Sequence, residues 1–440
     1  MGTSSRTDRY IIKRFILLSL AVLLVVVVTP SFLHQSAQTV AQTTNTKTAK
    51  ATNVVTDWNE TAIKVTQAAA VSATSQFRAL AITHAAIFDA VNASDRRYTP
   101  YAVDIKAPSG TSIEAAAASA GYSVLTSLYP AQQTTLDAAL TASLAKIPES
   151  QGKTDGINLG KQVATKIIAL RSQDGWDAKV DYKPGTGPGV WQPTPPTFAA
   201  ALTPQIAKAT PFTFKNIDQF QVPPPLALNS APYAKEINEV KSIGGKNSKV
   251  RTADQTAAAI FWTVPTPLIW NAAARAAAIK KGIDILDSAR LFALLNLAGT
   301  DGYIAGYGIK YKYNFWRPVT AIRNADVAGN PAISADPNWE PLLITPAHPD
   351  YISGHCVSSG APERILQKFF GSDKVNLSFT FPLNTGVTRS YTSFSQIGKE
   401  VGEARIWGGI HTRTADIQGE KLGYQVADYA FQNFLRPIKK

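Results

Sequence analysis

The sequence of 440 residues predicts an all-α protein built from helical bundles with long proline-rich connections. Alanine-rich segments carry apolar residues at the spacing of one helix face, and no segment alternates strongly between apolar and polar residues. Prolines gather between residues 182 and 231, where they interrupt helical pattern. Because 45% of the residues are hydrophobic and only 17% are charged, the composition excludes a charge-rich disordered chain.

The first 41 residues are typical of a secretory signal peptide. Basic residues precede an apolar run at 15–28, and small residues at 39 and 41 allow cleavage after Ala41. The run is shorter than the roughly 20 residues that span a bilayer. We therefore expect a secreted or periplasmic protein with no membrane span after cleavage, and a retained N-terminal anchor is the alternative. Residues 42–56 are predicted to be a flexible leader.

Two helical regions follow the leader. Residues 57–230 form the first, with helices predicted at 60–93, 111–128, 131–146 and 154–172 before the irregular connection at 182–231. Residues 231–440 form the second, with helices predicted at 233–244, 252–262, 271–280, 284–299, 355–370, 392–405 and 412–432. Binding sites of helical bundles lie between facing helices. The second region carries the candidate chemistry.

The net charge of +13 fits a nucleic acid, an anionic membrane surface or an anionic ligand as partner. No continuous basic stripe or nucleic-acid-binding motif occurs, so we expect no nucleic-acid partner. The single cysteine, Cys356, excludes an internal disulfide framework and a cysteine zinc site. Without an evident activating base it is predicted to be a packing residue. His84 lies in an apolar helical pattern and is predicted to be structural.

Three segments of the second region carry polar residues in a distinctive order: GIKYKYNFWRPVTAIR, HPDYISGHC and EARIWGGIH. Six residues separate the lysine from Arg-Pro in the first segment, and five separate arginine from histidine in the third. The candidate site residues, in chain order, are Lys310, Arg317, Ser353, Gly354, His355, Arg405 and His411.

These residue types suit an oxyanion site. Arginines bind a tetrahedral oxyanion through a planar fork, and lysine acts as a point charge. Ser353 offers a hydroxyl and Gly354 an unobstructed backbone N–H, and a helix starting near His355 would add positive charge at its N-terminus. One histidine can then act as acid and base, while the other bonds to the central atom.

The ordered set resembles the signature shared by vanadium-dependent haloperoxidases and the type 2 phosphatidic acid phosphatase superfamily. NFWRPVTAIR is similar to the haloperoxidase version, and the segments at 77–93 and 261–267 are similar to parts of secreted bacterial haloperoxidase-like proteins. The resemblance implies a haloperoxidase-like helical-bundle architecture with vanadate as cofactor. The implied partners are hydrogen peroxide, a halide ion and an organic acceptor.

The resemblance also implies a role for each residue. His355 is implied as the acid and base, and His411 as the axial ligand of the metal, vanadium. Lys310 is implied to polarise hydrogen peroxide, which a halide ion then attacks to give hypohalous acid. The implied vanadate-binding or phosphate-binding residues are Lys310, Arg317, Ser353, Gly354 and Arg405.

Two further residues bear on the halide pocket. His348 lies five residues before Ser353, where the family's chloroperoxidases resemble one another in carrying phenylalanine and its bromoperoxidases in carrying histidine. We therefore expect His348 to tune the pocket toward bromide, against the alternative of a loop histidine without a role. Trp316 either lines this pocket or belongs to the core.

The sequence departs from the signature at three positions. Ile352 and Ala404 stand where the family usually has proline and serine. Ala415 stands where an aspartate often orients the axial histidine, and Asp416 follows one residue later. Because a metal-bound histidine usually needs such a partner, either Asp416 reaches His411 or another acceptor does.

Two alternatives to the haloperoxidase remain open. One is an exported acid phosphatase in which His411 accepts the phosphoryl group. The other is a non-catalytic helical binding protein with a degraded site. The sequence leaves the oligomeric state open, including a homo-oligomer.

Overall fold

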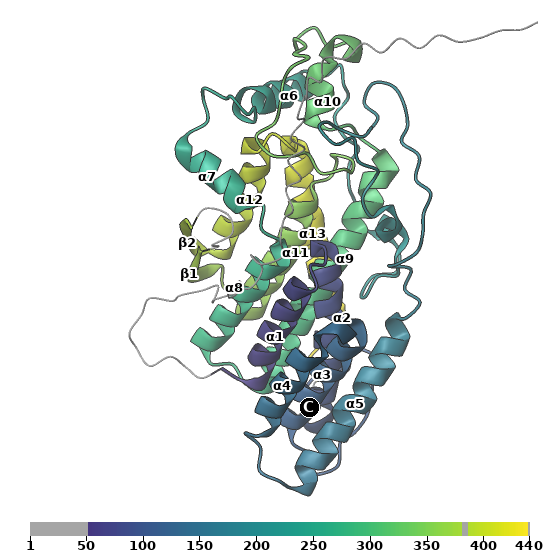
Figure 1. The fold of residues 1–440 in the computed structure, drawn as a ribbon, viewed down its shortest axis with the longest axis vertical. Coiled ribbons are helices and arrows are strands. Elements are labelled where there is room, and N and C mark those ends of the chain that lie inside the picture. The colour runs from purple at the N-terminus through teal and green to yellow at the C-terminus, as the bar shows by residue number, and fades with distance from the viewer. Residues whose placement is uncertain (1–51, 381–385, 439–440) are drawn as a thin grey trace, which may run out of the picture. The chain divides into compact units, whose positions relative to one another are not determined.

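Thirteen α-helices and one two-stranded hairpin make up the regular structure of residues 52–380 and 386–438, the part of the chain that the computed structural model describes (Figure 1). The predicted all-α class is therefore confirmed. The helices are α1 (Val54–Ala68), α2 (Ala73–Asp95), α3 (Ile113–Leu128), α4 (Gln133–Leu144), α5 (Gln151–Arg171), α6 (Ala231–Ile243), α7 (Ala253–Phe261), α8 (Thr266–Lys281), α9 (Ile285–Tyr313), α10 (Pro318–Arg323), α11 (Gly354–Phe370), α12 (Phe394–Trp407) and α13 (Arg413–Asn433).

Helix α1 begins inside the predicted leader. Asn53 accepts the backbone N–H groups of Val55 and Thr56, and the Thr56 hydroxyl accepts the Asn53 N–H, so a capping box fixes the start of the helix. The prediction of a leader through residue 56 was therefore wrong for 54–56. The predicted signal peptide and residues 42–51 lie outside the described residues.

The single helix predicted over 60–93 is two helices. Ala70 takes the left-handed conformation with φ of +51°, which ends α1. The Ser72 hydroxyl then accepts the backbone N–H of Ser75 at 3.3 Å and starts α2 as its N-cap. The apolar pattern of the sequence continues across this break, so the break was not predicted.

Helix α9 is longer than predicted and carries Lys310 in its last turn. The sequence pattern predicts an end at 299, where glycines begin to interrupt the apolar residues. These glycines allow close packing: a Cβ on Gly299 would lie 2.4 Å from Phe77 Cε1, and one on Gly306 would lie 2.8 Å from Val357 Cγ1. The glycines therefore admit neighbouring helices and do not end α9.

Strands β1 (Lys374–Thr380) and β2 (Thr388–Ser393) pair antiparallel, with Leu377 opposite Tyr391. No segment of the sequence alternates strongly between apolar and polar residues, so this hairpin was not predicted. In β1 alternate residues are buried, as a half-buried strand requires, but the pattern covers only seven residues. The helix predicted from residue 392 begins at Phe394, after β2.

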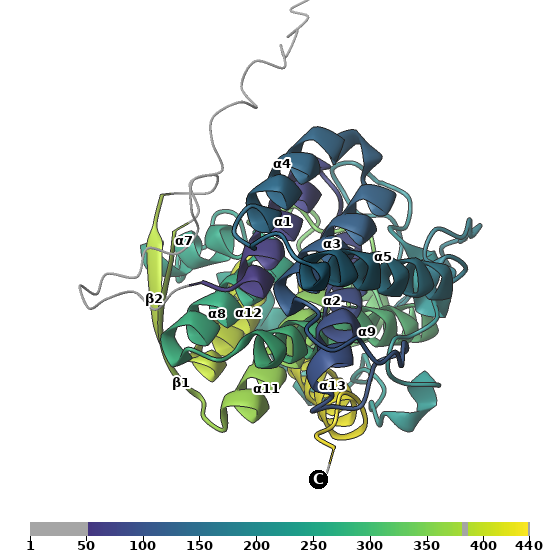
Figure 2. The ribbon, with the colours of Figure 1, turned by 90° about the horizontal axis from the view of Figure 1, so that it is seen from below.

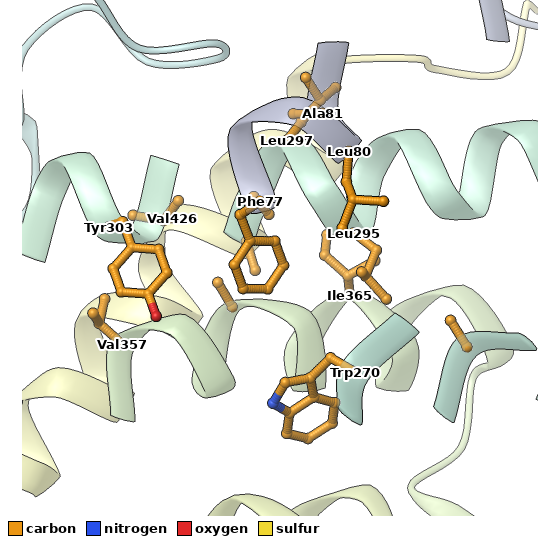
Figure 3. Packing of buried hydrophobic residues seen from close by; sticks show 14 of the residues in the cluster. Phe77, Leu80, Ala81, Trp270, Leu295, Leu297, Tyr303, Val357, Ile365 and Val426 are labelled. Carbon is orange, nitrogen blue, oxygen red and sulfur yellow. The ribbon is translucent and has the colours of Figure 1, made fainter. Parts of the chain in front are cut away.

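The core lies where α9 packs against α2, α11 and α13 (Figures 1 and 2). Figure 3 shows Phe77 of α2 beside Tyr303 of α9, and their rings meet edge to face with centroids 5.9 Å apart. Trp270 of α8 and Val357 of α11 belong to the same buried cluster. Helix α9 therefore connects the N-terminal helices to the region that carries the candidate site.

The proline-rich connection between α5 and α6 is irregular, as predicted, apart from short 3-10 turns at Pro204–Lys208 and Ile217–Gln219. Asp301, buried in α9, anchors it by accepting the backbone N–H groups of Phe212 at 2.6 Å and Thr213 at 2.7 Å. The connection is thus tied to the core helix.

Within the described residues, no helix combines the length and the apolar content that crossing a bilayer demands.

Candidate active site

The predicted site residues come from the ends of five helices. Lys310 lies in the last turn of α9 and Arg405 in the last turn of α12. Arg317 precedes α10 and Ser353 precedes α11 as their N-cap residues. His411 lies just before α13. All five are buried, so residues spread over 102 positions converge inside the molecule.

Arg317 links two of the histidines. Its Nε donates to the His348 carbonyl at 2.6 Å, and one terminal nitrogen lies 2.9 Å from His348 Nδ1. The other terminal nitrogen donates to the Ile410 carbonyl at 2.6 Å and lies 3.1 Å from His411 Nε2. The guanidinium fork therefore holds the segment before α11 against the segment before α13.

Lys310 is fixed on the loop that leads to α11. Its ammonium donates to the carbonyls of Pro349 at 2.7 Å and Asp350 at 3.1 Å. A Cβ added to Gly354 would lie 3.7 Å from Lys310 Cε, so the first residue of α11 runs close beside the lysine stem. The helix N-terminus and the lysine thus present positive charge at one place.

Ser353 starts α11 and joins it to α13. Its hydroxyl accepts the backbone N–H of Cys356 at 3.5 Å, and its own N–H donates to the Ala415 carbonyl at 2.9 Å. The first N–H groups of α11 have no partner within the helix, as at any helix start, so they can bind an anion.

Arg405 and His355 complete the set. Arg405 donates from one terminal nitrogen to the Trp262 carbonyl at 2.7 Å, and its buried Nε has no hydrogen-bond partner among the described residues. His355 is half-buried. Burial lowers the pKa of His355 well below 6.5, and the positive charges of Arg405, Lys310 and Arg317 lower it further.

Burial opposes the charge on every ionisable side chain of the site. It lowers the pKa of Lys310 well below its usual value, and lowers the pKa values of Arg317 and Arg405 to about 10. Burial also raises the pKa of Asp350 to about 6 and that of Asp416 well above its usual value. An anionic ligand would therefore relieve the cost of keeping the buried cations charged.

The acceptor for His411 is Asp350, which the sequence analysis did not single out. Asp350 Oδ1 lies 2.6 Å from His411 Nδ1. Asp416, the acceptor considered from the sequence, receives a hydrogen bond from Cys356 Sγ at 3.2 Å. Asp350 lies three residues before Ser353, inside the HPDYISGHC segment, so an acidic residue within the signature was the available signal.

The other sequence predictions have clear positions. The His348 ring lies against Tyr307, with centroids 5.6 Å apart. The Trp316 indole is buried and donates to the Tyr233 hydroxyl at 2.8 Å, so its polar edge points to α6. His84 is buried in α2 with Nε2 2.8 Å from Asn59 Nδ2, as expected of a structural histidine.

The departures from the signature are packed as core residues. Ile352 and Ala404 are completely buried. Cys356 is buried too, as predicted, although it borders a cleft of about 550 Å³ between α11, α12 and α13 that Asp416 also lines.

Comparison with known proteins places the chain near one group of enzymes. Residues 290–440 match the family model described as the VCPO second helical-bundle domain. The vanadium chloroperoxidase of Curvularia inaequalis is 29% identical over 180 residues, which are 34% of this chain and 29% of that protein. The chain thus matches less than a third of that relative's length.

Solved structures extend the likeness to most of the fold. A bacterial vanadium-dependent iodoperoxidase is 25% identical with a TM-score of 0.74, covering 88% of this chain and 98% of that one. The holo form of a bacterial vanadium-dependent chloroperoxidase is 19% identical with a TM-score of 0.70 and the same coverage. The resemblance identified from the sequence motifs is therefore confirmed.

Proposed function

We propose that this chain, which has the fold of the vanadium-dependent haloperoxidases and matches them in sequence over residues 290–440, is an exported vanadate-dependent haloperoxidase. The observation that carries the proposal is the cluster of buried cations, Lys310, Arg317 and Arg405, around the two histidines His355 and His411.

The residues fit vanadate. An oxyanion would compensate the buried positive charge and give the unpartnered Nε of Arg405 an acceptor. Burial lowers the pKa of His411 well below 6.5, so its imidazole is neutral and has a lone pair to offer a metal. The N–H groups at the start of α11 add donors from the backbone.

Vanadate bound there supplies a Lewis acid that activates hydrogen peroxide without a change of oxidation state. The side chains orient the reactants and move protons. A neutral imidazole nitrogen of half-buried His355 accepts a proton from hydrogen peroxide and later returns it. The Lys310 ammonium and the N-terminus of α11 stabilise the negative charge that develops on oxygen.

We propose bromide as the favoured halide because histidine occupies position 348. The imidazole, 2.9 Å from a terminal nitrogen of Arg317, extends the polar surface of the site toward the Tyr307 ring. His348→Phe should shift the ratio of bromide to chloride oxidation toward chloride. An unchanged ratio in steady-state assays with each halide would sink this assignment.

The proposed function is tested with the mature chain, residues 42–440, loaded with orthovanadate. Peroxide-dependent bromination of an organic dye and hydrolysis of a phosphate monoester are measured side by side. Bromination is expected, and Lys310→Ala should reduce it by about 100-fold or more. Lys312→Ala is the matched control, because Lys312 is exposed on the same helical turn and should leave the rate unchanged.

The same pair of assays separates the alternatives. Vanadate and phosphate have similar shapes, and His411 Nε2 could accept a phosphoryl group as well as bind vanadium. Strong hydrolysis without bromination would favour the acid phosphatase. Failure of both reactions, in protein that is folded, would favour the non-catalytic binding protein.

A further inference from the structure

We infer that Asp350 is the positioning residue of the site: it fixes the tautomer and the orientation of His411. The inference rests on the proposed function for its purpose, but the hydrogen bonds that carry it belong to the chain itself. Asp350 thus takes the orienting role that the spacing in the sequence suggested for Asp416.

The contact with Asp350 defines the tautomer of His411. An ionised carboxylate only accepts hydrogen bonds, so the contact of 2.6 Å between Asp350 Oδ1 and His411 Nδ1 places the proton on Nδ1. A terminal nitrogen of Arg317 lies 3.1 Å from His411 Nε2 and 3.5 Å from Nδ1, so it sits near both ring nitrogens and not along the outward lone pair of Nε2. Because the proton is on Nδ1, Nε2 is the nitrogen with the free lone pair.

Asp350 is itself held from three directions. The Thr412 hydroxyl donates to Asp350 Oδ2 at 2.8 Å. The Asp350 backbone N–H donates to the Phe315 carbonyl at 2.9 Å, and the Asp350 carbonyl accepts from Lys310 at 3.1 Å. The side chain is completely buried, and its contacts with His411 through Oδ1 and with Thr412 through Oδ2 fix its orientation, while the other two contacts fix the backbone. One residue thus sets both the imidazole of His411 and the ammonium of Lys310.

Asp350→Asn should reverse the tautomer. An amide can turn its NH₂ group toward His411 Nδ1, which makes Nδ1 an acceptor and moves the proton to Nε2. A protonated Nε2 cannot bind a metal, and loss of an orienting partner typically weakens metal binding by about 10-fold to 100-fold. Thr412→Val is the matched control, since it removes a neighbouring hydrogen bond to Asp350 and keeps the contact with His411.

The experiment uses nitrogen-15 histidine NMR on the protein without vanadate. The His411 signal is assigned as the one that His411→Gln removes. The wild type and Thr412→Val are expected to carry the proton on Nδ1, and Asp350→Asn on Nε2. A wild-type signal with the proton on Nε2 would overturn the inference directly, without any variant that has to fold.

Calorimetric titration with orthovanadate gives the second measurement. Asp350→Asn should bind at least about 10-fold more weakly than the wild type, with Thr412→Val much nearer to the wild type. Equal affinity and an unchanged tautomer in a folded Asp350→Asn protein would refute the positioning role. A wild type that binds no vanadate refutes the proposed function instead, and the NMR result still decides the role of Asp350.

Discussion

Replacing Glu363 by glutamine tests whether a buried carboxyl is protonated in the folded protein at neutral pH. Glu363 lies in α11 and is completely buried. Its Oε1 accepts the Tyr424 hydroxyl at 2.5 Å and the Gln367 amide at 3.0 Å, while Oε2 has no partner among the described residues. Burial raises the pKa of Glu363 from 4.5 to about 8.

The sign and size of the effect follow from this pKa. Between pH 4.5 and pH 8 the folded state keeps a proton that the unfolded state releases, so the free energy of unfolding falls as the pH rises. At about 1.4 kcal/mol for each pH unit, the loss reaches at most about 5 kcal/mol near pH 9. Glutamine has the shape of the protonated acid, so Glu363→Gln should not show this loss.

The assay is urea unfolding of the wild type and Glu363→Gln at pH values from 5 to 9. The two free energies should be similar near pH 5 and diverge toward pH 9, with the variant more stable. Glu340→Gln, at an exposed position, is the control, and its free energy of unfolding should vary with pH in parallel with that of the wild type. Parallel curves for Glu363→Gln and the wild type would refute the reasoning, since Glu363 would then be ionised in the folded state.

Three other changes probe packing, the proline-rich connection and the anion site. Gly398→Ala should lower the free energy of unfolding by about 1–3 kcal/mol, because the new Cβ would lie 1.9 Å from Glu363 Oε2. Thermal unfolding measures this loss. Gly402→Ala in the same helix is the control, because its Cβ would make only ordinary van der Waals contacts. Asp301→Asn should lower the free energy of unfolding by about 2 kcal/mol and speed proteolysis of the proline-rich connection, because the buried N–H donors of that connection lose an acceptor. An unchanged rate of cleavage would contradict the view that Asp301 anchors the connection. Arg317→Lys should weaken vanadate binding by about 10-fold or more in calorimetry, since one ammonium cannot reproduce the hydrogen bonds of the planar guanidinium. Retained affinity would show that charge alone suffices.

The sequence predicted the fold class, and it proposed candidate site residues that lie close together in the structure, because both depend on local pattern. Helical spacing identified most helices, and the order of the signature residues located the cations and histidines. It could not predict the length of α9, because the fit of Gly299 against Phe77 depends on a helix more than 200 positions away. It missed the role of Asp350 for a similar reason: the partner of Asp350, His411, is 61 positions away.

The hairpin shows a different limit. Its burial pattern is regular, but a seven-residue strand gives too few repeats to stand out from a helical background. The break between α1 and α2 was not predicted for a similar reason. A single alanine in the left-handed conformation does not interrupt the apolar pattern of the sequence.

The path of α9 limits how far the protein can be trimmed. A fragment that starts at residue 290 would contain every predicted site residue, from Lys310 to His411. It would also uncover the side of α9 that packs against α2, including the place where Phe77 meets Gly299. An apolar surface of that kind drives self-association in water. A soluble minimal version therefore has to keep α2, even though α2 contributes no predicted site residue.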